Sequence, residues 1–78
     1  MTSEVADLLA ALLAAVDIPL PASGDDERAF NALLERRTTI VRTVLEGIVS
    51  DGEIAAFDAD SVRRSVARSP ILYEPYSA

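Results

Sequence analysis

The chain has 78 residues, of which 50% are hydrophobic and only 5% aromatic, and its formal net charge is −6. It contains no Cys, His, Lys or Trp. This excludes disulfides and thiolate metal sites, and it removes the usual general base and the lysine of Schiff-base and P-loop chemistry. Abundant Ala and Leu favour closely packed helices over a sheet. We therefore expect one small all-α domain over residues 1–78, without enzymatic activity or a cofactor.

The charge and the apolar runs also limit the partners of the chain. An acidic protein has no general attraction to nucleic acid or to an anionic membrane. The apolar run Leu8 to Val16 follows acidic rather than basic residues and is too short to span a bilayer. We expect a cytoplasmic protein that binds neither a membrane nor a small molecule.

A first helix is predicted over residues 3–17, where Thr2 or Ser3 can cap it. Its apolar residues recur at helical spacing. They are Val5, Leu8, Leu9, Leu12, Leu13 and Val16. The opposite face is mostly alanine, so the helix is apolar almost all round, which is typical of burial on more than one side. Two interpretations stay open: a second contact surface, or a lightly buried alanine face in an ordinary bundle.

A second helix is predicted over residues 25–50, after a proline-containing connector over residues 18–24. Ser23, Gly24 or Asp25 can cap it. Its apolar stripe consists of Phe30, Leu33, Leu34, Ile40, Val41, Val44, Leu45, Ile48 and Val49. Such a helix would be roughly 39 Å long, whereas a compact chain of this size is only roughly 30 Å across. It must either break or leave apolar surface for another element or another chain.

Two features disturb the stripe of this second helix. Arg37 falls on it, and residues 38–41 are all β-branched, which lowers helix propensity. The competing prediction is a strand from Thr38 to Leu45. The apolar residues keep one helical phase through this run, which favours the helix. If the helix bends, we expect the bend at the β-branched run.

Arg37 is the charge that most needs an explanation. A guanidinium on an apolar stripe is costly unless it is paired, or unless its stem packs while its head reaches water. The sequence leaves open a solvent-reaching Arg37 and a salt bridge to another chain. In the second case the Arg36–Arg37 pair would orient an acidic partner.

A third helix, short and poor in apolar residues, is predicted over residues 58–68. Gly52 is expected to end the second helix in the left-handed conformation, and residues 53–57 are compatible with a short helical turn. Asp58 or Asp60 can cap the third helix. Because it has few apolar positions, we expect it to rest on the other helices rather than to organise them.

The C-terminal tail over residues 69–78 is predicted to be extended, since Pro70 biases Ser69 away from helical geometry. The tail is unusually apolar for a terminus. Its large apolar residues are Ile71, Leu72, Tyr73 and Tyr76. They either fold back over the helices or dock into another protein as an extended peptide, and the sequence leaves both open.

The third helix resembles the recognition helix of a helix-turn-helix. Its basic residues are Arg63, Arg64 and Arg68. The segment 53–56 looks like the end of a preceding helix, but only residues 57–61 separate it from Val62. That spacing is shorter than the motif needs, and the net charge has the wrong sign. The other interpretation is a solvated helix whose arginines pair with Asp58, Asp60 or the acidic N-terminal region.

The last functional site to consider from the sequence is a calcium site. Four acidic residues lie close in sequence: Asp51, Glu53, Asp58 and Asp60. The EF-hand pattern needs ligands at alternating positions, Gly at the sixth position and Glu at the twelfth. These residues do not fit it, and a turn and helix caps explain them better. We predict no metal site.

The sequence therefore predicts an all-α bundle of three helices near residues 3–17, 25–50 and 58–68, with a long central helix. We expect a non-catalytic interaction module, either an accessory subunit or a homo-oligomer, that buries spare apolar surface against a protein partner. The residues predicted to bind that partner are Arg36, Arg37, Val41, Val44, Ile48, Leu72, Tyr73 and Tyr76. The alternative is a small DNA-binding regulator that uses the three arginines of the third helix.

Overall fold

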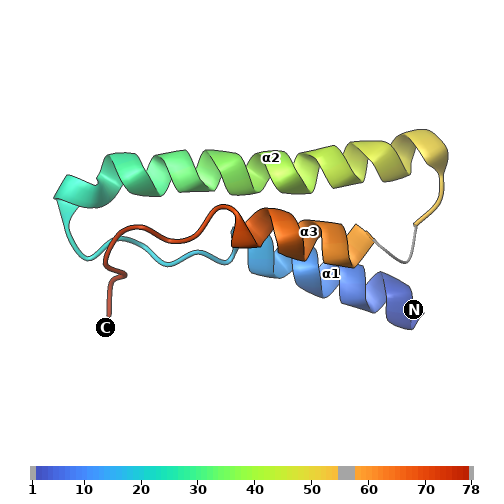
Figure 1. Cartoon of the computed structure of the whole chain (residues 1–78), viewed down its shortest axis with the longest axis horizontal. Coiled ribbons are helices and arrows are strands. Elements are labelled where there is room, and N and C mark those ends of the chain that lie inside the picture. The colour runs from blue at the N-terminus through green and yellow to red at the C-terminus, as the bar shows by residue number, and fades with distance from the viewer. Residues whose placement is uncertain (1, 55–57, 78) are drawn as a thin grey trace.

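The computed structural model describes residues 2–54 and 58–77, which form three α-helices and one 3-10 turn (Figure 1). In chain order the elements are α1 (Ser3–Val16), η1 (Gly24–Asp26), α2 (Glu27–Asp51) and α3 (Asp58–Ala67). The all-α bundle with one long helix is confirmed, and each helix boundary lies within two residues of its prediction. The turn predicted over residues 53–57 lies partly outside the described residues.

The ends of the elements follow from local sequence signals. Thr2 caps α1, since its hydroxyl oxygen accepts a hydrogen bond from the Val5 amide at 3.2 Å. Gly52 ends α2 with a φ of 72° and donates its amide to the Ile48 carbonyl at 2.7 Å. This left-handed conformation is strained for any residue with a Cβ atom. The predicted cap of α1 and the predicted stop of α2 are confirmed.

Helix α2 runs unbroken for 25 residues, which corresponds to about 37 Å. The β-branched residues 38–41 are helical, so α2 contains neither the strand nor the bend that the sequence allowed (Figure 1). Within this run, the hydroxyl of Thr39 donates to the Glu35 carbonyl at 2.9 Å, a bond that Thr can make inside a helix. The molecule is elongated to match the helix, with principal extents of 42 × 22 × 17 Å.

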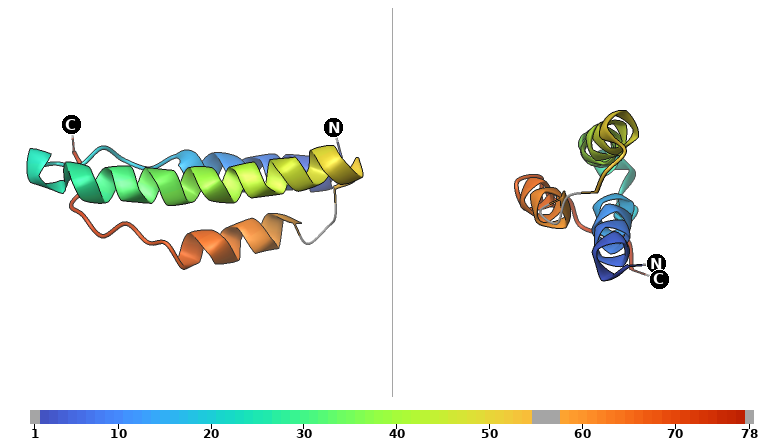
Figure 2. Two further views of the ribbon diagram at one scale, coloured as in Figure 1. Left: turned by 90° about the horizontal axis from the view of Figure 1, so that it is seen from above. Right: turned by 90° about the vertical axis from the view of Figure 1, so that its right-hand side faces the viewer.

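The core lies where the three helices meet. Its buried members are Leu8, Ala11, Leu12 and Ala15 of α1 with Ala59 and Val62 of α3. Half-buried residues of α2, including Ile40 and Val44, pack against this cluster. Alanines at the contact let the helices approach closely, so the short α3 can pack against both longer helices. Figure 2 shows α1 and α2 antiparallel, with α3 on one side of the pair.

The C-terminal tail folds back along the connector between α1 and α2. The Ala22 amide donates to the Glu74 carbonyl at 2.9 Å, and the Tyr76 amide donates to the Leu20 carbonyl at 2.7 Å. These bonds form a short antiparallel pairing of two extended segments. The tail therefore packs on its own chain, which decides one of the alternatives that the sequence left open.

Tyr73 anchors the tail. Its side chain is buried, and its ring meets Phe30 edge to face, with ring centroids 6.0 Å apart. Its hydroxyl donates to the Pro19 carbonyl. The part of α2 that extends beyond α1 is thus covered by the connector and the tail. Among the described residues, no helix combines the length and the apolar character needed to cross a membrane.

Candidate protein-binding surface

Arg37 lies in the interior of the chain and is only 5% exposed. Its Nη1 donates to the Ala15 carbonyl at 3.0 Å, while its Nε and Nη2 both donate to the Ser69 carbonyl, at 3.2 and 2.9 Å. Ala15 belongs to the last turn of α1, and Ser69 follows the end of α3. The guanidinium therefore caps the C-terminal ends of two helices, where a positive charge is favourable.

This arrangement differs from both possibilities considered for Arg37 from the sequence. The head group does not reach water, and its partners are carbonyl oxygens of the same chain. Sequence reasoning missed these partners because every residue has a carbonyl, so no residue type marks the acceptor. The only available signal was that a proline follows soon after both α1 and α3, which leaves their last carbonyls without helical partners.

The other predicted partner-binding residues do not gather in one place. Tyr73 is buried against Phe30, and Val44 and Ile48 are half-buried against the core. The exposed ones are Arg36, Leu72 and Tyr76. Val41 is half-buried, and it is the one predicted residue that also belongs to the apolar surface defined in the next paragraph.

An apolar surface does form on the side of α1 and α2 that faces away from α3. We call it the open face. It consists of Leu9, Leu13 and Val16 on α1 and of Leu34, Val41, Leu45 and Val49 on α2. Leu13 is 68% exposed and Val49 is 84% exposed. These residues of α1 belong to its predicted leucine and valine stripe, whereas its alanine face is the one that packs against α3.

The position of the open face follows from helical spacing. The residues of α1 that line a groove with α3 are Ala10, Ala11 and Ala14. Those of α2 that line grooves with α3 include Ala32, Thr39, Ile40 and Thr43. With 3.6 residues per turn, the residues of the open face lie on the opposite flank of each helix. The right-hand view of Figure 2 shows α3 on one side of the pair, and the other side carries no helix of the described residues.

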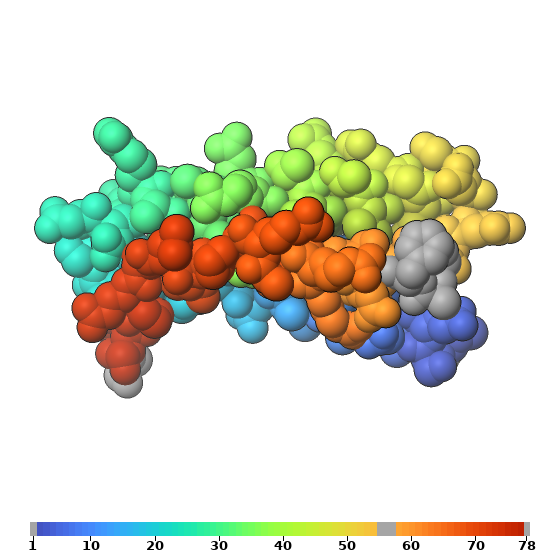
Figure 3. All heavy atoms as spheres, in the orientation of Figure 1, coloured from blue at the N-terminus to red at the C-terminus, as the bar shows by residue number. Residues whose placement is uncertain are grey.

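The side of the α1–α2 pair opposite the open face carries α3. In Figure 3, α3 and the tail lie in front of α1 and along the lower edge of α2, while α2 stays visible along its length. The open face belongs to the far side of this view. Of the two sides of the α1–α2 pair, only the one in this view carries α3.

A groove of about 620 Å³ follows the α2 part of the open face. Its apolar floor comes from Val41, Leu45 and Val49. Arg42 and Glu46 lie on its rim and form an exposed ion pair, with Nε and Oε1 3.3 Å apart. Such a pair contributes little to stability, but it gives the rim one charge of each sign. The centre of the open face is uncharged.

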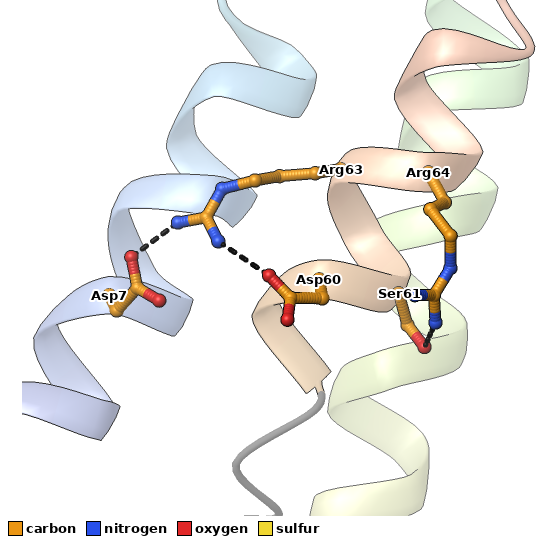
Figure 4. Close-up of polar contacts among 5 residues, drawn as sticks. All are labelled: Asp7, Asp60, Ser61, Arg63 and Arg64. Carbon is orange, nitrogen blue, oxygen red and sulfur yellow. Dashed lines mark hydrogen bonds and ion pairs between the residues drawn. The ribbon is translucent and has the colours of Figure 1, made fainter.

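The arginines of α3 belong to a separate, polar surface. Arg63 donates to the carboxylate of Asp7 on α1 and, at 3.1 Å, to that of Asp60 (Figure 4). The pKa of Arg63 is raised above its ordinary value, mainly because its guanidinium donates to Asp7. Arg64 donates to the Ser61 hydroxyl at 3.3 Å. Arg63 thus has two carboxylate partners, as the solvated-helix interpretation expects, and a basic patch would depend on Arg64 and Arg68.

The described residues contain no group of three or more acidic, His or Cys side chains placed to hold a metal ion. Comparison with known proteins finds no matching family, no similar curated protein and no similar solved structure. The inference about function therefore rests on the surfaces of the molecule.

Proposed function

We propose that this chain is a non-catalytic protein–protein interaction module that works by burying its open face against a protein partner. The observation that supports this is the gathering of large apolar side chains on one flank of two antiparallel helices. Single exposed apolar residues are normal on any protein. A contiguous apolar patch with a polar rim is typical of a binding surface.

The size of the open face fits this role. Six of its seven residues are between 37% and 84% exposed, and the largest apolar patch of a typical monomer is roughly 300 to 600 Å². A standard interface buries about 800 Å² on each partner, including a polar rim. The open face with its rim has the size of a small interface.

The shape of the open face favours a helical partner surface. Two antiparallel helices present their apolar stripes side by side, as they do toward the remaining helices of a four-helix bundle. The chain supplies only three helices among its described residues, and α3 lies on the other side. A partner would complete the packing that the chain leaves unfinished.

The proposal is tested by measuring the size at which the chain elutes from an extract of the cells that make it. We expect the 8.3 kDa chain to elute as part of a larger species. The variants Leu13→Glu and Val49→Glu should shift it to the size of the monomer, because a carboxylate cannot be buried unpaired in an apolar interface.

The matched control is Leu72→Glu, which alters a side chain that is 79% exposed but lies on the tail. It should leave the elution unchanged. Elution of the unaltered chain at the monomer size, or a larger size that all three variants retain, would overturn the proposal.

A further inference from the structure

We infer that the partner of the open face is a second copy of this chain, which deepens and rests on the proposed function. The first observation is how the residues of α1 and α2 align along the common direction of the two helix axes. The hydrogen bond from Arg37 to the Ala15 carbonyl places the middle of α2 beside the last turn of α1. Because both helices rise about 1.5 Å per residue and are antiparallel, Leu13 is level with about residue 39 and Leu9 with about residue 43.

The two apolar stripes therefore overlap, because Leu9 to Val16 is level with about residues 36–43 in the middle of the α2 stripe. On α1 the stripe runs from Leu9 to Val16, and on α2 it runs from Leu34 to Val49. A two-fold axis parallel to the helices leaves every residue at the same position along the helix direction. It places the α1 stripe of one copy opposite the α2 stripe of the other. It lays α1 of one copy on α2 of the other, twice, as an isologous interface requires.

This arrangement also gives the favourable helix directions. Since α1 and α2 are antiparallel within one copy, α1 is antiparallel to α2 of the other copy as well. All four neighbouring pairs are then antiparallel, as in an up-down-up-down bundle. The helix dipoles of neighbours oppose one another throughout the assembly.

The side chains at the rim fit the same arrangement. Arg42 and Glu46 flank the stripe of α2, and Glu46 would meet the exposed Ala6 beside the stripe of α1. Small uncharged residues let the second helix approach and offer no like charge. Stacking α2 directly on α2 about the same axis would instead bring the rim residue Arg42 of both copies to the same height along the helices.

The area fits a weak dimer. Two open faces that covered each other fully would bury on the order of 1,000 Å², which is at the lower end for specific interfaces. We therefore expect dissociation within the concentration range of a sedimentation experiment rather than a permanent dimer.

Sedimentation equilibrium of the purified full chain, from about 1 to about 500 µM, measures this directly. We expect a concentration-dependent monomer–dimer equilibrium. Leu13→Glu should weaken it by at least about tenfold, while Leu72→Glu leaves it unchanged. Circular dichroism establishes that each variant keeps its helices. A folded chain that stays monomeric throughout would overturn self-pairing.

The proposed function is judged separately by the extract experiment. A chain that is monomeric when pure, but that elutes in a larger, open-face-dependent species in extract, retains the proposed function and loses this inference.

The orientation of the two copies has its own test, because the chain contains no cysteine. We expect a mixture of the Leu9→Cys and Leu45→Cys variants to form a disulfide-linked dimer under mild oxidation faster than either variant alone. In the proposed arrangement, Leu9 of one copy faces Leu45 of the other, whereas the two Leu9 positions lie on the diagonal. Faster linking of Leu9→Cys with itself would overturn this orientation.

Discussion

Arg37 and Ser69 are joined by two hydrogen bonds, because Nε and Nη2 of the guanidinium donate to the same carbonyl oxygen, at 3.2 and 2.9 Å. This contact links the middle of the long helix to the point where α3 ends and the tail begins. With the third bond, to Ala15, one side chain ties together the ends of the two other helices. Arg37 is therefore a structural residue of the fold.

Replacing Arg37 should destabilise the chain. We expect Arg37→Leu to lower the free energy of unfolding by about 2 to 4 kcal/mol, because it leaves the Ala15 and Ser69 carbonyls without their donor. Urea unfolding at low protein concentration measures this. The control is Arg36→Leu at an exposed neighbouring position, which should change stability by only about 0.5 kcal/mol. A stabilising Arg37→Leu substitution would contradict the structural role.

The attachment of the tail depends on Tyr73. Tyr73→Phe removes the hydroxyl that donates to the Pro19 carbonyl and should cost about 1 kcal/mol. Tyr73→Ala also removes the ring that packs on Phe30 and should cost about 3 kcal/mol. Thermal unfolding compares both with Tyr76→Phe, whose side chain is 60% exposed and which should be neutral. Equal stability of all three variants would show that the tail does not contribute to the fold.

Alanine substitutions at two glycines near the C-terminal end of α2 should change the stability of the chain in opposite directions. Gly52→Ala should destabilise by about 1 kcal/mol, because residue 52 has a φ of 72°. Gly47→Ala should stabilise by about 0.5 to 1 kcal/mol, since it lies inside α2 and a Cβ there meets nothing within 4 Å. Chemical unfolding of the pair gives the sign of each change. The same sign for both would contradict the described end of α2.

Salt should strengthen the proposed dimer. Each copy has a net charge of −6, so association brings two negative molecules together. Raising the ionic strength from about 0.05 M to about 0.5 M shortens the Debye length severalfold and screens this repulsion. Sedimentation at both ionic strengths should show a lower dissociation constant in high salt. A marked weakening would indicate that ion pairs between the copies, rather than apolar burial, hold the dimer.

The boundaries of the helices could be predicted because their causes are local. Thr2 at the start of α1 and Gly52 at the end of α2 act on residues within one turn. The helical phase of the apolar residues also outweighed the weak propensity of residues 38–41, because packing on one face of a helix contributes more than propensity does. The sequence by itself therefore determined the fold class, the number of helices and their lengths.

The candidate surface could be predicted only in part. The sequence indicated spare apolar surface on both long helices, but it assigned Arg37 and Tyr73 to partner binding, and the structure buries both. Their partners, Ser69 and Pro19, lie 32 and 54 positions away in the chain and present only a backbone carbonyl. No periodicity or residue type identifies such a contact.

Tertiary structure alone decided which apolar flank the chain covers. Helix α1 is apolar almost all round and α2 has a broad apolar stripe, so periodicity permits several ways of packing the short third helix. The fold places α3 against the alanines of α1 and attaches the tail to the connector, and this leaves the flank with Leu13 and Val49 in water. Local forces determined the helices, whereas the open face is what remains after long-range contacts have covered the rest.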